Sequence, residues 1–242
     1  MEKLEAAWQI GPNAKASRLR VVKQFLTAAG NKDAAMWEIR AQPHPKMDRV
    51  FLSEEAVQDL RKIAHSMGPE IELIFSLGVD NSLRAGDQAR ITFEEAKALL
   101  WKDQAVITCK GRGGGKRRLM VMHRATREPL KAYLKLREDL VTKHGSDPGN
   151  LLVTDHTGQL ENMNSDGVQW RVEKLSAQAG VYFRSHDQRA TFGNRHWKRG
   201  TDLLTIAALM GHETPNTTFR SYIGVNQGDM RDAQDLLGEG GR

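Results

Sequence analysis

Cysteine is nearly absent from the 242-residue sequence, in which Cys109 is the single one. One cysteine excludes both an internal disulfide and a cysteine-rich zinc site, and this scarcity is typical of proteins in a reducing compartment. We interpret Cys109 as a small core residue of a strand rather than as a reactive thiol, because cysteine in such a setting usually serves packing.

Long apolar segments are also missing. No apolar run approaches the roughly 18–20 residues that a membrane span requires. The charged start Met1–Glu5 lacks the apolar region of a secretory signal. The sequence therefore predicts a cytoplasmic protein without a membrane partner. Its 39% hydrophobic and 27% charged residues are typical of a folded chain, long enough for one large domain or for one domain with a small appendage.

Acidic residues are fewer than basic ones: 30 Asp and Glu stand against 36 Lys and Arg, which gives a net charge of +6. Such an excess favours polyanions as partners, because cations neutralise phosphates. Two segments, 110–118 and 195–199, concentrate basic residues and contain no acid, although each could be merely a solvated basic turn. The candidates for phosphate contact are Arg112, Lys116, Arg117, Arg118, Arg195, Lys198 and Arg199.

Apolar residues at helical spacing dominate the chain. We expect helices at about 16–29, 34–39, 53–67, 70–78, 126–144, 168–179, 186–199, 202–210 and 229–237, with Ser53 as an N-cap. Strands are expected at 91–93, 105–109 and 119–122, and the Gly-rich segment 110–118 forms a hairpin tip. The sequence thus predicts a mostly α fold with a small three-stranded antiparallel β-sheet (α+β). Residues 1–45 are expected to form a short helical N-terminal arm and residues 46–242 the main domain.

The last quarter of the chain holds residues suited to phosphodiester chemistry. His186 and Arg189 are spaced i, i+3, so on a helix they share one face and could touch one phosphate. Gly211 and His212 follow the end of an expected helix, and Tyr222 comes soon after. Phosphodiester transfer without a metal requires a nucleophile, cations for the phosphate oxygens and groups that move protons. Each histidine alone is more often structural, but the ordered set indicates catalysis.

This segment resembles the C-terminal signature of the tyrosine recombinase family, the phage-type integrases that act through a covalent phosphotyrosine. That family shows His-x-x-Arg, then Leu-Gly-His, then Thr-Thr and the nucleophilic tyrosine. This chain has His186-Asp-Gln-Arg189, Met210-Gly-His212, Thr217-Thr218 and Tyr222. The resemblance covers roughly residues 49–230 and implies the tyrosine recombinase catalytic-domain fold for residues 46–242.

Two motifs upstream extend the resemblance. Leu83-Arg84-Ala-Gly-Asp87 is similar to the first arginine motif of the family, with Asp where Glu is common. Lys110 falls at the expected hairpin lysine, with Lys116 as the alternative in this long tip. The resemblance implies that Arg84 and Arg189 bind non-bridging phosphate oxygens, each with a planar fork of donors. It also implies that Lys110 protonates the 5′-oxygen.

The remaining roles follow from the same resemblance. Tyr222 would attack the scissile phosphorus, giving a 3′-phosphotyrosine bond and a free 5′-hydroxyl. His186 would assist proton transfer at the tyrosine, and His212 would hydrogen-bond the pentavalent transition state. Asp87 would support the site by orienting a neighbouring catalytic side chain. A phosphotyrosine conserves the bond energy, so the resemblance implies no cofactor, no metal ion and no ATP.

Two further features depart from the family pattern. Tyr222 lies ten positions after His212, one more than is common, and an extra helical residue rotates later side chains by about 100°. Tyr133 and Tyr182 are the alternative nucleophiles. Residues 1–45 are shorter than the core-binding domain of the family, so we interpret them as its remnant, in a shortened natural protein or in a fragment of a longer one.

The sequence therefore predicts a site-specific DNA recombinase, such as the integrase of a mobile genetic element or virus. One alternative is a type IB topoisomerase-like nicking-closing enzyme. Another is a truncated, non-catalytic integrase relic that binds DNA and interferes with full-length partners. The expected partners are double-stranded DNA and further copies of this chain, from dimer to tetramer, joined through the tail at 229–237. The expected location is the nucleoid or host chromosome.

Overall fold

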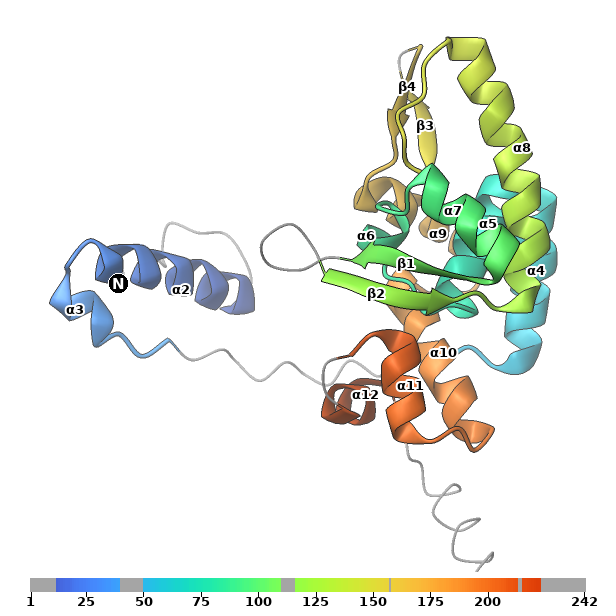
Figure 1. Ribbon diagram of the computed structural model, residues 1–242. Coiled ribbons are helices and arrows are strands. Elements are labelled where there is room, and N and C mark those ends of the chain that lie inside the picture. Colours follow the sequence, from blue (N-terminus) through green and yellow to red (C-terminus); the bar gives the residue numbers. More distant parts are fainter. Residues whose placement is uncertain (1–11, 40–49, 110–115, 157, 213–214, 223–242) are drawn as a thin grey trace, which may run out of the picture. The chain divides into compact units, whose positions relative to one another are not determined.

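The computed structural model describes residues 12–39, 50–109, 116–156, 158–212 and 215–222. The chain divides into two units, Met1–Asp48 and Arg49–Arg242, and each is described by itself (Figure 1). The expected roles of these parts, a remnant arm and a catalytic domain, stay predictions. The hairpin tip with Lys110 and Arg112, and the expected tail helix at 229–237, lie outside the described residues.

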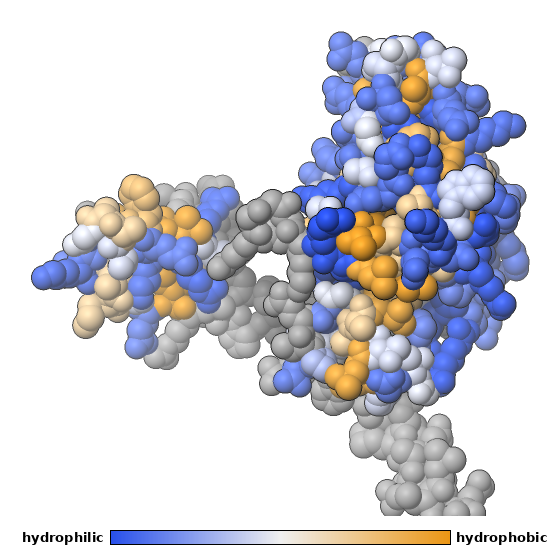
Figure 2. Space-filling model, in the orientation of Figure 1, coloured by the Kyte–Doolittle hydropathy of each residue, from blue (hydrophilic) through white to orange (hydrophobic). Residues whose placement is uncertain are grey.

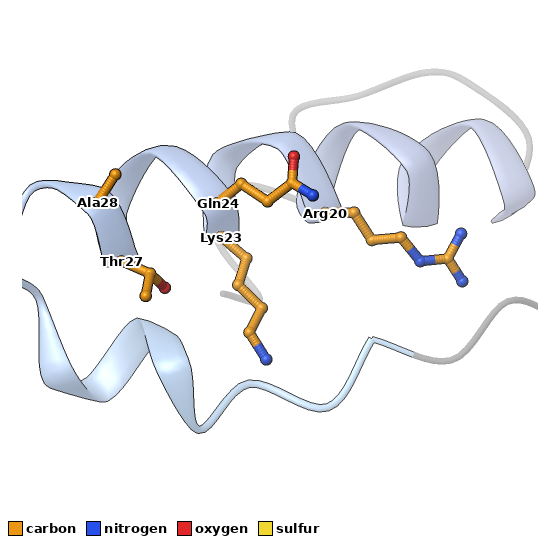
Figure 3. A pocket seen from close by; sticks show the side chains of 5 residues that line it. All are labelled: Arg20, Lys23, Gln24, Thr27 and Ala28. Carbon is orange, nitrogen blue, oxygen red and sulfur yellow. The ribbon is translucent and has the colours of Figure 1, made fainter. Parts of the chain in front are cut away.

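The first unit contains helix α2 (Pro12–Ala28) and the short helix α3 (Lys32–Ala35). Asn31 is the N-cap of α3, where its side chain accepts a hydrogen bond from Ala34 N at 3.0 Å. Helix α3 begins earlier than the helix expected at 34–39, and it is shorter. A shallow pocket runs along α2, and Figure 3 shows the side chains that line it: Arg20, Lys23, Gln24, Thr27 and Ala28.

The second unit is built around helix α5 (Pro69–Val79), which is buried at Ile71 and from Leu73 to Val79. Three longer helices pack against α5: α4 (Glu54–Met67), α8 (Arg127–His144) and α9 (Ser165–Ala179) (Figure 1). Such an all-round apolar helix needs neighbours on every side, which explains its central place. Helix α4 begins as predicted, because the Ser53 side chain accepts a hydrogen bond from Ala56 N.

Two small antiparallel sheets flank these helices. Strands β1 (Gln104–Cys109) and β2 (Lys116–Val121) pair in one sheet, and β3 (Val153–His156) and β4 (Gln159–Asn162) in the other. The predicted class, mostly α with a small antiparallel sheet, is confirmed. The predicted number of strands is wrong: in the described residues each sheet has two strands, not three.

The expected strand at 91–93 is instead the start of helix α7 (Phe93–Lys102). Thr92 is the N-cap: its hydroxyl accepts from Glu95 N, and the Glu95 carboxylate accepts from Thr92 N at 2.8 Å. This reciprocal pair satisfies two donors of the first turn. Thr92 also forms one isolated bridge to Asn150, which is its whole β pairing within the described residues.

The β1–β2 hairpin has one buried and one exposed face. Ile107 pairs with Arg118 and Cys109 with Lys116, so Ile107, Cys109 and Arg118 share the inward face. On the outward face, Val106 pairs with Leu119, and these side chains are 43% and 57% exposed. Figure 2 shows this apolar surface over the hairpin. Successive residues of β2 therefore point in opposite directions.

The C-terminal helices form a second, smaller core. They are α10 (Ser185–Lys198), α11 (Leu203–Met210) and α12 (Pro215–Tyr222), and they pack against one another (Figure 1). Phe192 of α10 meets Ile206 and Met210 of α11 in this core. Gly211 ends α11 with a left-handed φ of 65°, a conformation that favours glycine. In the part of the chain that the structure describes, no helix is long and apolar enough to span a bilayer.

Candidate active site

Arg189 lies at the centre of the candidate site, on α10, with a side chain that is 0% exposed. Its Nη1 donates to Ser82 O, in the turn after α5, and its Nη2 donates to Met210 O at 2.6 Å. The same Nη2 lies 2.7 Å from His212 Nε2. One buried guanidinium thus joins the turn after α5 to the end of α11. This explains how residues separated by more than a hundred positions come together.

His212 is neutral and its tautomer is fixed by its neighbours. A guanidinium can only donate, so His212 Nε2 accepts from Arg189 and the ring proton resides on Nδ1, 2.6 Å from Thr218 Oγ1. Burial, and then the positive charges of Arg189 and Arg84, lower the pKa of His212 to about 3. Thr218 lies on α12 and is fully buried, and its bond to Nδ1 holds the imidazole in place.

Arg84 and Asp87 stand beside Arg189. Arg84 is the N-cap of the short helix α6 (Ala85–Gln88), and Asp87 is its third residue. Arg84 Nη1 lies 3.6 Å from Asp87 Oδ2, with the Arg84 side chain 45% exposed and that of Asp87 1% exposed. The Arg84 guanidinium is half-exposed, so it can meet a ligand, and the buried Asp87 carboxylate beside it keeps it in place. This geometry fits the orienting role that the sequence predicts for Asp87.

The pocket at this place brings the predicted residues to one surface. Arg84, Asp87, His186 and Arg189 line it, with Ala85, Gly86, Arg90, Ser165 and Ser185. His186 lies exposed in the first turn of α10. Ser185, which precedes it, donates to Gln169 Oε1 of α9 at 2.5 Å, and this bond fixes the start of α10. The structure thus joins two predicted arginines and one predicted histidine in one pocket, with His212 bonded behind them.

Tyr222 is the last residue of α12, and its side chain lies outside the described part of the structure. The alternative nucleophiles are poorly placed. Tyr133 is fully buried, accepts a hydrogen bond from Val153 N at 3.0 Å, and has a pKa that burial raises to about 12. Tyr182 is 66% exposed and lines a different hollow, formed by α9 and the segment that follows it.

The basic candidates at 195–199 have different surroundings. Arg195 is 16% exposed and binds both carboxylate oxygens of Glu54, at 2.9 and 2.8 Å, and Asp80 at 3.4 Å. The bond to Arg195 lowers the pKa of Glu54. Arg199 is 63% exposed and reaches Glu54 at 3.3 Å, and Lys198 is exposed. Arg195 therefore forms internal ion pairs that join α4, α5 and α10. Lys198 and Arg199 remain accessible.

The candidates on β2 also differ. Arg117 is exposed on the outward face of the hairpin. Arg118 points inward, and its Nη1 donates to Leu209 O of α11 at 3.3 Å. Lys116 is the first residue of β2, with a side chain outside the described part of the structure. The phosphate-binding role of these residues stays a prediction, and the contacts of Arg118 point to another role.

Three polar residues of the site were not singled out in the sequence. Ser82 accepts from Arg189, Thr218 accepts from His212, and Ser185 anchors the start of α10. The Thr217-Thr218 pair was a visible motif, but nothing in it assigns the bond to an imidazole. In the described residues, no group of three or more His, Cys, Asp or Glu is placed to hold a metal ion.

Comparisons with known proteins show what the whole second unit is similar to. The model of the phage integrase family matches residues 50–229. Tyrosine recombinase XerA of Thermococcus onnurineus is 24% identical over 198 residues, which are 82% of this chain and 66% of that protein. The chain thus spans slightly less than two thirds of this relative.

Solved structures show the same fold. The Tn1549 transposon integrase in complex with a circular intermediate DNA matches 95% of this chain and 81% of its own, with a TM-score of 0.69 and 14% identity. A lambda integrase dimer bound to a COC′ core site matches 87% of this chain and 58% of its own, with a TM-score of 0.57 and 15% identity.

Proposed function

Because the chain belongs to the phage integrase family, we propose that it is a site-specific DNA recombinase that cleaves and rejoins DNA through a covalent 3′-phosphotyrosine. One observation supports this most strongly. Arg84, His186 and Arg189 line one pocket, and His212 is hydrogen-bonded to Arg189. A pocket with two guanidiniums and one imidazole, and with a second imidazole bonded to one of the guanidiniums, suits the negative charge of a phosphodiester in its transition state.

In this proposal the arginines divide the work by their exposure. Arg84, half-exposed, meets the phosphate first, and Asp87 holds its guanidinium in place. Arg189, fully buried, presents a guanidinium already ordered by Ser82 and Met210 carbonyls. Preordered donors lose little freedom when charge develops on the phosphate, so they stabilise the transition state more than the ground state.

The nucleophile and the proton donor complete the reaction. Tyr222 attacks the phosphorus, and the 5′-oxygen leaves with a proton from Lys110. His186 takes up the phenol proton. Because the new phosphotyrosine bond retains the energy of the broken one, a 5′-hydroxyl can attack it and restore the DNA without ATP. Neither step requires a cofactor or a metal ion.

Double-stranded DNA is the proposed partner, together with further copies of this chain. The Tn1549 integrase was solved with DNA, and the lambda integrase as a dimer on DNA. We assign the exposed Arg117, Lys198 and Arg199 to backbone phosphates, with Arg112 and Lys116 of the hairpin. The tail at 229–237 is proposed to join copies into a dimer or tetramer. The place of action is the chromosome or nucleoid of the host cell.

Covalent trapping tests the proposal. A nicked suicide duplex, carrying the DNA that flanks the coding region, loses its short 5′-fragment after cleavage and cannot be resealed. We expect a denaturation-resistant adduct with the full chain and none with Tyr222→Phe, while Tyr182→Phe serves as the matched tyrosine control. An adduct that persists in Tyr222→Phe would refute the assignment of the nucleophile. DNA binding without any adduct would identify a non-catalytic relic instead.

Two further comparisons separate the remaining alternatives. Lys110→Ala should abolish cleavage and Lys116→Ala should leave most of it, and the reverse result would exchange their roles. Relaxation of supercoiled plasmid by a monomer, without exchange between two sites, would indicate a type IB topoisomerase-like enzyme. Formation of recombinant joints between two labelled duplexes would support the recombinase.

A further inference from the structure

Arg118 is a basic residue of the hairpin whose surroundings do not fit a DNA contact. It lies on the inward face of β2, opposite Ile107, whereas its neighbour Arg117 is exposed on the outward face. The Arg118 Nε atom is buried and has no hydrogen-bond partner among the described residues. Its Nη1 donates to Leu209 O, a carbonyl in the last turn of α11. The side chain is thus directed at α11 rather than at solvent.

The backbone of Gly211 lies directly against this side chain. A Cβ atom at Gly211 would stand 2.6 Å from Arg118 Nη1 and 2.7 Å from its Cδ, both closer than real contacts allow. The glycine therefore permits the arginine to pack flat on the turn that ends α11. His212, which follows immediately, is bonded to Arg189 and Thr218. Arg118 supports this turn from the side of the hairpin. Arg189 and Thr218 hold the imidazole through its two ring nitrogens.

We propose that Arg118 is a positioning residue, which holds the Gly211–His212 turn against the β1–β2 hairpin and so sets the place of the catalytic imidazole. This inference rests on the proposed function for its effect on cleavage. It joins two segments that are far apart in the sequence: strand β2 and the turn that carries His212. A shift of β2 then displaces the turn, so Arg118 keeps the imidazole of His212 in its place.

Two contacts and one electrostatic effect distinguish this role from that of an exposed contact to a backbone phosphate. The guanidinium of Arg118 is bonded to a helix carbonyl and packed on a glycine, whereas Arg117, the neighbouring residue assigned to a backbone phosphate, is exposed. Its positive charge also contributes to the low pKa of His212, after burial, Arg189 and Arg84. That influence requires the guanidinium to remain near the imidazole in the folded protein.

The test compares two adjacent arginines of one strand. We expect Arg118→Met, which keeps the apolar stem, to lower the single-turnover cleavage rate at saturating DNA by about 10²-fold, the cost of a misplacement near 1 Å. DNA affinity and its salt dependence should not change. Arg117→Met, at an exposed residue that we assign to a backbone phosphate, should weaken DNA binding, and the slope of log K against log salt should fall by about 0.9, the value for one phosphate. Arg118→Lys, which retains a donor for Leu209 O, should recover part of the rate.

A pair of glycines tests the same contact from the other side. Gly211 and Gly180 both end helices with φ near 65°, but a Cβ at Gly180 meets nothing within 4 Å. The two alanine variants carry the same backbone strain, and they differ in the overlap with Arg118. We expect Gly211→Ala to reproduce the cleavage loss and Gly180→Ala to retain the wild-type rate. Equal rates in the two variants would overturn the proposal.

A measurement without DNA keeps the inference separate from the proposed function. In protein with ¹⁵N-labelled histidine, Arg118→Met should shift the His212 ring signals and raise the pKa of that ring, and Arg117→Met should leave both unchanged. If the wild-type chain forms no adduct, the proposed function fails, and this spectrum still decides the contact. Unchanged His212 signals in Arg118→Met, or a loss of DNA affinity equal to that of Arg117→Met, would refute the positioning role.

Discussion

Acid should destabilise this protein through His212, and the size of the effect follows from its surroundings. Burial and the guanidiniums of Arg189, Arg84 and Arg118 lower the pKa of the folded ring to about 3 from an ordinary 6.5. Between these values the unfolded chain binds a proton that the folded chain does not. The free energy of unfolding therefore falls as the pH falls through this window, by up to about 1.4 kcal/mol per pH unit. From pH 6.5 to pH 5 the loss is about 2 kcal/mol, a large part of an ordinary stability of about 5–15 kcal/mol.

Urea denaturation of the wild type and of His212→Gln from pH 7.5 to 5 measures this contribution. Glutamine keeps an acceptor for Arg189 but cannot take up a proton, so its stability should depend less on pH. His123 and His196, whose pKa values are also lowered chiefly by burial, act in both proteins and cancel in the comparison. We expect the wild type to lose about 2 kcal/mol more than the variant below pH 6.5. Parallel curves would show that His212 is not held neutral, and the reasoning would fail.

Three further predictions concern buried contacts. Thr218→Val removes the acceptor of the His212 Nδ1–H and leaves a buried donor unpaired, which costs about 1–3 kcal/mol. Single-turnover trapping should show cleavage that is at least about tenfold slower. An unchanged rate would refute the role of this bond. Gly78→Ala places a Cβ 1.9 Å from Gln188 Oε1, so urea denaturation should show that the free energy of unfolding falls by about 1–3 kcal/mol. Adding Gln188→Ala to this variant should recover most of that stability. If the two substitutions lower the free energy of unfolding additively, the clash is refuted. Tyr133→Phe leaves Val153 N without its acceptor and should cost about 1–3 kcal/mol, and its adduct should form at the wild-type level per folded molecule.

The helices were largely predictable because their apolar residues repeat at helical spacing. Helix α5, for example, was expected at 70–78 and lies at Pro69–Val79. The strands were less predictable because short apolar runs fit either structure. Ile91, Thr92 and Phe93 each favour strands, yet the reciprocal bonds between Thr92 and Glu95 start a helix there. Strands β3 and β4 carry mostly polar, exposed residues, so no alternating pattern marks them.

The site was predictable as far as ordered motifs reach. The motif at His186 and Arg189, and the one at Arg84, named residues that line one pocket. Contacts between distant segments were not predictable, because composition does not reveal which side of a strand or helix faces a partner. Arg117 and Arg118 are equivalent in a basic run and opposite on β2. Arg195 likewise resembles a DNA-binding residue until Glu54, 141 positions earlier in the sequence, is placed beside it.

The charges of the pocket explain why His212 must change partners during the proposed reaction. Without DNA, its Nε2 accepts from Arg189 and cannot donate to a phosphate. A phosphodiester anion beside Arg84 and Arg189 offsets the positive charges that, after burial, lower the pKa of the ring. It also offers Arg189 Nη2 a charged acceptor, which binds this donor more strongly than a neutral imidazole does. The ring nitrogen then becomes free to take up a proton and to donate it as a hydrogen bond to the phosphate. In the proposed reaction, DNA binding thus prepares the imidazole for catalysis. The ring is neutral in the free protein first because it is buried, and then because of the cations that we propose to bind the substrate.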